Sequence, residues 1–268
     1  MNRDLLFCTG SAWRAKQLRA VSLWLIVLLG LGITVRGKHV GGSGSQTAGA
    51  ARLRPAMLIW NVGVGDPKGP DQLIEVVTQA TLGDRKTWRV IHYSQDPTLD
   101  ETNSYDLYDL DAVSLAPLRS VYNSQGSHLE LLFGDKEVTV RHTSSKGSEP
   151  EKVPVTEPVK PEGPGETAFV ASLPLHPGYH LQYKMVDRWD GRGQGRLKTV
   201  DLSVLKKDVE RTALGKRPVY IVRVKPTDGS FEITQRVLAA APHFPVKIEY
   251  VRGGLRVVSE IASLAIGV

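Results

Sequence analysis

Two histidines that lie four residues apart are the first feature of the sequence that could do chemistry. His176 and His180 have the spacing with which a helix presents two zinc ligands on one face. Pro177 and Gly178 stand between them and prevent such a helix, because proline lacks the backbone donor of a helical turn. In a strand, the same spacing separates the side chains by about 13 Å, too far for one ion. We therefore predict no metal site here.

Carboxylates and glycines form two further candidate motifs. Tyr105–Asp111 contains three aspartates, but leucines separate them and the glycine turn of a calcium loop is missing. A short acidic strand or turn is the expected structure. Asp190–Gly195 is rich in glycine, yet it joins two predicted strands, so no helix N-terminus is available to hold a phosphate. Neither a calcium site nor a phosphate loop is predicted.

Nucleophilic chemistry has no recognisable motif in this chain. No serine lies in the strained strand-to-helix turn of a nucleophile elbow. Because a catalytic triad is assembled in space and not along the sequence, an exported hydrolase remains an alternative. The single cysteine, Cys8, excludes an intramolecular disulfide and a cysteine-based metal site. We predict no catalytic residue, no metal ligand and no cofactor.

The positive charge of the chain is concentrated at one end. The 268 residues carry a formal net charge of +6, but residues 1–50 contain six lysines and arginines and only one acidic residue. The remaining residues carry 28 basic and 27 acidic side chains. A nearly neutral body is not the electrostatic pattern of a nucleic-acid-binding protein. We therefore predict no nucleic-acid partner.

The N-terminal segment has the layout of an export signal. Ala20–Val35 is uncharged, and basic residues precede and follow it. It is shorter than the roughly 20 residues of a full membrane span, and no small-residue cleavage site follows it directly. Residues 1–36 are therefore predicted as a signal peptide or as a hydrophobic signal-anchor helix. Either one places the body outside the cytoplasm, in the periplasm or cell envelope, and an anchor would make the membrane a partner.

The body of the chain shows a series of hairpin signals. Short apolar stretches with a period near two alternate with Gly, Asp and Asn turns, such as Gly83-Asp84, Asp228-Gly229 and Gly253-Gly254. Lys206–Leu214 fits both a helix and a strand, and we interpret it as a strand. The fold class is therefore predicted to be all-β, an antiparallel meander that forms a curved sheet or incomplete barrel.

A proline-rich segment interrupts this meander. Ser144–Thr167 holds five prolines, alternating Glu and Lys, and no aromatic residue, so we expect it to be extended or disordered and to contribute nothing to the core. The sequences on either side share a phrase, Pro117–Tyr122 and Pro245–Tyr250, which suggests two similar half-sheets. The predicted organisation is a signal segment (1–36), a flexible tether (37–55) and a β domain (56–262) with halves 56–143 and 168–262 and the insert 144–167.

These features resemble the DUF3108 family of exported bacterial proteins. The resemblance rests on Ser114–Tyr122 after Asp106–Asp111, on Ser172–Tyr179, on Leu197–Val224 with Gly215 before the strand, and on Val246–Ile261. It covers about residues 70 to 262. It implies an envelope location and a curved antiparallel sheet similar to lipoprotein-carrier folds, and it implies no reaction.

Three functions remain open from the sequence. The first is a non-enzymatic binding or assembly module of the cell envelope, for example for a lipid or another amphiphile. The second is the exported hydrolase, and the third is a structural envelope domain with a sealed core. Trp60, Trp88 and Trp189 are predicted to pack in the core. The alternative for these rings is an apolar cavity that holds an acyl chain, as the first function would need.

Overall fold

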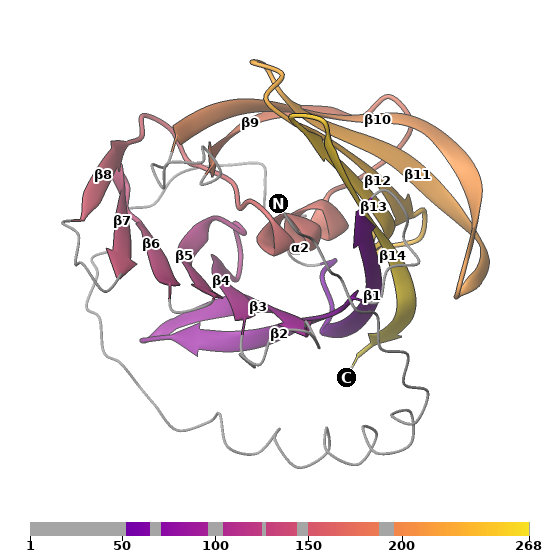
Figure 1. Cartoon of the computed structure of the whole chain (residues 1–268), viewed down its shortest axis with the longest axis horizontal. Coiled ribbons are helices and arrows are strands. Elements are labelled where there is room, and N and C mark those ends of the chain that lie inside the picture. The colour runs from indigo at the N-terminus through magenta and orange to yellow at the C-terminus, as the bar shows by residue number, and fades with distance from the viewer. Residues whose placement is uncertain are drawn as a thin grey trace, which may run out of the picture. The chain divides into compact units, whose positions relative to one another are not determined.

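The body of the chain is an antiparallel sheet that curves around helix α2 (Pro164–Ser172), as Figure 1 shows. The computed structural model describes residues 52–64, 71–95, 104–124, 127–143, 150–187 and 196–267. All of them belong to the second of two units into which the chain divides, residues 39–268. The sheet confirms the predicted all-β antiparallel class.

The predicted N-terminal hydrophobic helix, at residues 20–35, lies outside the described residues and stays a prediction. Among the residues that the structure does describe, no helix combines the length and the apolar character needed to cross a membrane.

The described sheet has 14 strands in the order β8-β7-β6-β5-β4-β3-β2-β1-β14-β13-β12-β11-β10-β9. Strands that follow one another in the chain are neighbours in this sheet, except β8 and β9, which lie at its two ends. β1 pairs with β14 and so joins the first eight strands to the last six. The strand bounds are β1 Ala56–Val64, β2 Asp71–Leu82, β3 Arg85–Gln95, β4 Ser104–Asp111, β5 Pro117–Ser124, β6 Ser127–Phe133, β7 Glu137–Thr143, β8 Glu151–Pro154, β9 His180–Asp187, β10 Arg196–Thr212, β11 Gly215–Pro226, β12 Glu232–Leu238, β13 Pro245–Arg252 and β14 Leu255–Ile266.

The predicted hairpins are present, and their turns follow the backbone freedom of glycine. Gly253 and Gly254 both have positive φ and form a two-residue turn between Arg252 and Leu255, as a type I′ turn requires. The hairpin expected at Asp228-Gly229 is present, but its turn is not the two-residue type I′ turn that is typical of this dipeptide. There the loop is longer, the Gly229 N–H bonds the Pro226 carbonyl, and Gly229 alone has positive φ. A type I turn followed by a left-handed glycine explains this geometry.

Helix α2 lies within the core that the sheet encloses. The residues from Gly165 to Ser172 are all buried. A Cβ atom on Gly165 would come within 2.9 Å of both Pro161 and Tyr108, so the helix packs closely against β4. Trp60 and Trp88 are buried in the same core, which confirms the packing role predicted for these rings. Trp189 lies outside the described residues.

The prediction that the proline-rich segment contributes nothing to the core is wrong for residues 150–167. Its valines Val153, Val155 and Val159 are buried, β8 pairs with β7, and Pro164 begins α2. The prolines occupy positions that need no backbone donor, such as the end of an edge strand and the first turn of a helix. The helix itself escaped prediction because its apolar residues surround it and leave no amphipathic period.

The two ends of the sheet, β8 and β9, are linked by the segment between β8 and α2. Val159 forms an isolated parallel bridge with Lys184 of β9, and the Lys160 N–H donates to the Lys184 carbonyl at 2.7 Å. The sheet is therefore open, as predicted, and this segment spans its seam. At the other side of β9, the prediction of a strand through Lys206–Leu214 is confirmed as far as Thr212.

Candidate functional site

The first candidate site lies on the outer face of strands β9, β10 and β11. Along β10 the side chains of Val200, Leu202 and Val204 are buried, and those of Asp201 and Ser203 alternate with them on the opposite, outer face. The alternation of side chains along this part of β10 thus places apolar residues on the inner face of the sheet and polar residues on its outer face.

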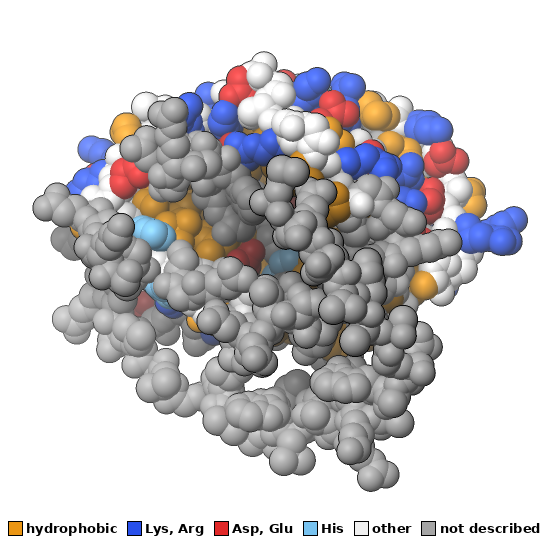
Figure 2. Space-filling view, in the orientation of Figure 1, with side chains coloured by type: hydrophobic (Ala, Val, Ile, Leu, Met, Phe, Trp, Pro, Cys, Tyr) orange, Lys and Arg blue, Asp and Glu red, His pale blue; other side chains and the backbone are white. Residues whose placement is uncertain are grey.

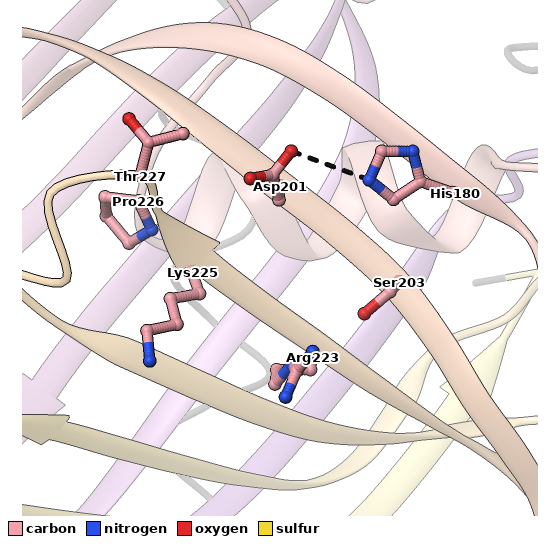
Figure 3. A pocket seen from close by; sticks show the side chains of 7 residues that line it. All are labelled: His180, Asp201, Ser203, Arg223, Lys225, Pro226 and Thr227. Carbon is pink, nitrogen blue, oxygen red and sulfur yellow. Dashed lines mark ion pairs between the residues drawn. The ribbon is translucent and has the colours of Figure 1, made fainter.

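The outer face carries a pocket of about 380 Å³, shown in Figure 3. The strand register explains its composition, because Ser203 lies between His180 of β9 and Arg223 of β11, while Asp201 is paired with Lys225. We call it the outer pocket, and its lining residues are His180, Asp201, Ser203, Arg223, Lys225, Pro226 and Thr227.

The charges of the outer pocket are unevenly compensated. Asp201 accepts a hydrogen bond from the Gln182 amide at 3.0 Å, and its carboxylate lies 3.5 Å from Nε2 of His180 (Figure 3). The Lys225 ammonium lies 3.4 Å from a carboxylate oxygen of Glu232. Arg223 is exposed and has no ion-pair partner within the described part of the chain. The guanidinium is thus the charge of this pocket that is left for a ligand.

The turn that closes the outer pocket is fixed by charge. The Asp228 carboxylate accepts a hydrogen bond from the Lys198 ammonium, which lowers the pKa of Asp228 to about 2, with a further contribution from Ser230. The Thr227 N–H donates to the Thr199 carbonyl at 2.9 Å. The hydroxyl-bearing residue Thr227 is therefore held next to Lys225 by contacts with β10.

Ser203, His180 and Asp201 are the three residue types of a hydrolytic triad, and the register brings them together. The arrangement lacks the other requirements of acyl transfer. Ser203 lies in the middle of a strand that is paired on both sides, so the backbone N–H groups around it are committed to the sheet and cannot form an oxyanion hole. The His180 and Asp201 side chains are 60% and 40% exposed, so water would screen the charges. The geometry favours binding over catalysis.

The structure separates the two histidines considered from the sequence. His180 begins β9 and reaches the outer pocket, whereas His176 precedes the strand and contacts the Pro177 carbonyl and the Tyr179 ring. Across the described residues, no group of three or more His, Cys, Asp or Glu side chains is arranged to hold a metal ion.

The other two motifs have different outcomes. The acidic segment Tyr105–Asp111 is a strand, β4, as expected. In it, Asp109 pairs with Arg89, and Asp111 accepts hydrogen bonds from the backbone N–H groups of Val113 and Ser114. The glycine-rich Asp190–Gly195 lies outside the described residues.

Sequence reasoning missed a second polar site, inside the sheet. The Tyr122 hydroxyl donates to Glu162 at 2.9 Å, and the Tyr183 hydroxyl donates to Glu166 at 3.4 Å. We call these four residues the acid–tyrosine cluster. Both carboxyl groups come from the proline-rich segment and flank Pro164-Gly165, a spacing of four that could have suggested a shared face of a helix.

The acid–tyrosine cluster is closed to solvent. Burial raises the pKa of Glu166 to about 8, although the hydrogen bond from Tyr183 opposes the shift, and the nearby Glu162 adds to it. Burial likewise raises the pKa of Tyr183 well above its usual value. The protonated Glu166 carboxyl and the Tyr183 phenol are neutral and hydrogen-bonded to each other, so this part of the cluster suits fixing α2 inside the sheet more than binding an ion.

Solved structures share this architecture at low sequence identity. A β-barrel-like protein of the DUF1849 family from Brucella abortus has a TM-score of 0.51 and 13% identity, over 80% of this chain and 98% of the other. A protein from Parabacteroides distasonis, provisionally described as a lipoprotein, has a TM-score of 0.31 and 9% identity over 80% and 96%. A provisionally described exported protein from Bacteroides fragilis has a TM-score of 0.29 and 12% identity over 80% and 96%.

Only the first of these similarities is close enough to support an argument, and at that identity it establishes the barrel-like fold alone. No curated protein matches the chain. The sequence profile of DUF3108, a family described as proteins of unknown function, matches residues 71–253, which runs from the start of β2 to the turn after β13. The resemblance predicted from the sequence is therefore confirmed, and the chain belongs to the DUF3108 family.

Proposed function

We propose that this protein is a non-enzymatic binding module of the cell envelope, and that it holds the anionic group of its ligand in the outer pocket. The observation that carries the proposal is the position of Arg223. Its guanidinium lines a pocket beside Lys225 and the hydroxyls of Ser203 and Thr227, and it has no ion-pair partner within the described residues.

The chemistry of these groups favours a phosphate or carboxylate. A guanidinium presents paired N–H donors that match two oxygens of such an anion, and nearby hydroxyls supply further donors. Asp201 keeps its negative charge and opposes this attraction, although Gln182 and His180 contact its carboxylate, but the lining contains two cations, Arg223 and Lys225, against this one acid. The same chemistry accommodates a free anion or the head group of an amphiphile, in keeping with the ligand class expected from the sequence.

The envelope location is part of the proposal. Its support is the basic and apolar pattern of residues 1–36, which is typical of export. The outer pocket would then face the periplasm, where both free phosphate-bearing solutes and lipid head groups are found. Whether the signal segment is cleaved or anchors the protein does not alter the binding chemistry.

Calorimetric titration of the purified protein tests the pocket. One arm uses inorganic phosphate and the other a short-chain phosphatidylglycerol below its micelle concentration. We expect saturable binding in at least one arm, and Arg223→Gln should weaken it about tenfold, since a lost charge-assisted pair is worth about 1.5–3 kcal/mol. Arg217→Gln is the matched control, because Arg217 is exposed on the same strand outside the pocket.

Each result of the titration separates the candidate functions. Binding of the lipid but not of phosphate identifies an amphiphile ligand, and binding of both identifies the anionic group itself. If neither binds, or if the Arg223 and Arg217 variants bind equally, the outer pocket is not the site and a structural envelope domain becomes the better interpretation. Ester hydrolysis that is abolished by Ser203→Ala would instead establish the hydrolase.

A further inference from the structure

The hairpin of β10 and β11 extends beyond the rest of the sheet. β9 pairs with β10 only between Arg196 and Ser203, and β12 pairs with β11 only from Val219 onward. The two long strands remain paired with each other to the Thr212–Gly215 turn. Residues 206–218 therefore form a two-stranded ribbon, at the far end of the orange strands in Figure 1.

The two faces of this ribbon differ in charge balance. One face carries Lys206, Asp208, Glu210 and Arg217, with equal numbers of acids and bases. Lys206 pairs with Asp208 at 2.7 Å, and Glu210 lies 3.0 Å from Arg236 of β12. This face is electrostatically compensated.

The opposite face has no acidic residue. We call it the basic face, and it consists of Lys207, Val209 and Arg211 on β10 and Lys216 and Pro218 on β11, all exposed. None of its three cations has an ion-pair partner among the described residues. Val209 is 61% exposed, and the turn at the tip adds the exposed Ala213, whereas the neighbouring Leu214 is half-buried and packs against the core. Figure 2 shows basic and acidic side chains together along this edge of the molecule, where the two faces of the ribbon meet.

The size of the basic face decides which partner it fits. From Lys207 to Arg211 the strand is about 13 Å long, and two strands are about 10 Å wide with their side chains. Such an area is several times smaller than the roughly 800 Å² that each partner contributes to a stable protein interface. A membrane surface needs much less, because a few cations attract anionic head groups and a few apolar side chains enter the interface.

We propose that the basic face and the Ala213-Leu214 turn dock the protein onto an anionic lipid bilayer. The cations lie at the level of the head groups, and Val209 with the tip of the turn reaches the boundary of the acyl chains. This inference does not depend on the proposed ligand of the outer pocket, since Arg223 and Lys225 lie outside the ribbon.

An environment-sensitive fluorophore at the tip tests the docking. Ala213→Cys, in a Cys8→Ser background, places a single label on the exposed turn of the full chain. Vesicles of phosphatidylcholine alone are compared with an equimolar mixture of phosphatidylcholine and phosphatidylglycerol. The fluorophore reports only on the surroundings of the ribbon tip. Attachment of the protein to the membrane through its N-terminal segment therefore does not by itself shift the fluorescence.

We expect a blue shift and protection from an aqueous quencher only with the anionic vesicles. Lys207→Glu with Arg211→Glu should raise the lipid concentration for half-maximal shift by at least about tenfold, because each basic residue near the surface contributes a comparable factor. Lys206→Glu with Arg217→Glu is the matched control. It makes the same charge change on the same two-stranded ribbon but on the compensated face, and should retain most of the shift.

Three results would overturn the proposal. They are an equal shift with neutral vesicles, an equal loss in both double variants, and a shift of the same size on adding a soluble acidic protein without lipid. The last would identify a protein partner. Titration of inorganic phosphate into the Lys207→Glu, Arg211→Glu variant should match the unchanged protein, because neither residue lines the outer pocket, so failure of the outer pocket and failure of the ribbon are distinguishable.

Discussion

The two halves of the sheet repeat one strand pattern around different interiors. Pro117 begins β5 and Pro245 begins β13, and the two prolines are 128 residues apart. Each lies opposite a register shift in the preceding strand, after Asp109 in β4 and after Arg236 in β12. The half-sheet similarity suggested by the shared sequence phrase thus extends to the position of a β-bulge, which proline accommodates because it donates no ladder hydrogen bond.

The equivalent inward rows of the two halves have opposite character. Cross-strand partners share one face of a sheet, so each row can be followed through the register. In β2, β3, β4 and β5 the row is polar, and in β10, β11, β12 and β13 it is apolar up to its final tyrosine. The rows are Glu75, His92, Asp106 and Tyr122 in the first half, and Leu202, Val224, Ile233 and Tyr250 in the second.

The difference shows that turn and bulge positions constrain the backbone without fixing what it encloses. The polar row ends at Tyr122, which donates to Glu162, so the first half supplies a partner for an acid of the segment that leads into α2. The second half supplies Tyr183 for Glu166, and most of its other buried side chains are apolar. Buried polar groups are costly unless paired, and the interior segment provides that pairing on both sides.

The largest expected effect comes from truncating a buried side chain of α2, the helix around which the sheet curves. Phe169 of α2 is buried, packs edge-to-face on Tyr183 at 5.5 Å, and lies under the Lys160 ammonium. We expect Phe169→Ala to lower the free energy of unfolding by about 3–5 kcal/mol, since truncating a buried aromatic leaves a cavity. Urea unfolding measures this value. Val209→Ala on the exposed ribbon is the control and should change it by less than about 0.5 kcal/mol.

A loss below about 1 kcal/mol for Phe169→Ala would mean that α2 is not integral to the core. The sequence alone predicts that residues 144–167 contribute nothing to the core, so that deleting Ser148–Gly165 would leave the melting temperature nearly unchanged. The structure reverses the expectation for Ser148–Gly165, because this deletion now removes β8, the seam and the start of α2.

The second effect separates the polar row of the first half from the apolar row of the second half by pH. Burial raises the pKa of Glu75 from 4.5 to about 8, and Oε1 of Glu75 has no hydrogen-bond partner among the described residues. The folded protein keeps this proton up to about pH 8, whereas the unfolded chain releases it near 4.5. The folded state therefore binds more protons throughout this window, and its stability falls as the pH rises through it.

Glu75→Gln should remove the part of this pH-dependent loss of stability that comes from Glu75. The expected difference between pH 5 and pH 8 is about 2–4 kcal/mol, because a pH unit inside the window contributes up to about 1.4 kcal/mol. Urea unfolding at several pH values measures it, and Glu166→Gln should act similarly. Gln235→Leu, at a buried polar position of the second half, is the control and should leave the pH slope unchanged. An unchanged slope in Glu75→Gln would show that Glu75 is ionised when folded.

The sequence was sufficient for the features that depend on local chemistry. Turn glycines and period-two alternation identified the hairpins, and the extension of β10 through Lys206 followed from the same pattern. Helix α2 was missed because its apolar residues follow no amphipathic period, which is a consequence of being enclosed by the sheet. The outer pocket was also out of reach, since Ser203 meets His180 and Arg223 only through a register that no single segment encodes.

The smallest effects distinguish two ion pairs of equal length, one in each half. Arg89 and Asp109 of the first half, and Arg256 and Glu249 of the second, each join at 2.6 Å. The Asp109 side chain is fully buried, whereas that of Glu249 is 27% exposed and Arg256 is 47% exposed. Arg89→Gln leaves a buried carboxylate without its cation, so we expect a loss of about 2–3 kcal/mol in urea unfolding. Arg256→Gln should cost much less, because water screens the exposed pair. Equal losses would mean that the N···O distance, and not burial of the acid, sets the strength of these ion pairs. The difference between the two halves would then not extend to their ion pairs.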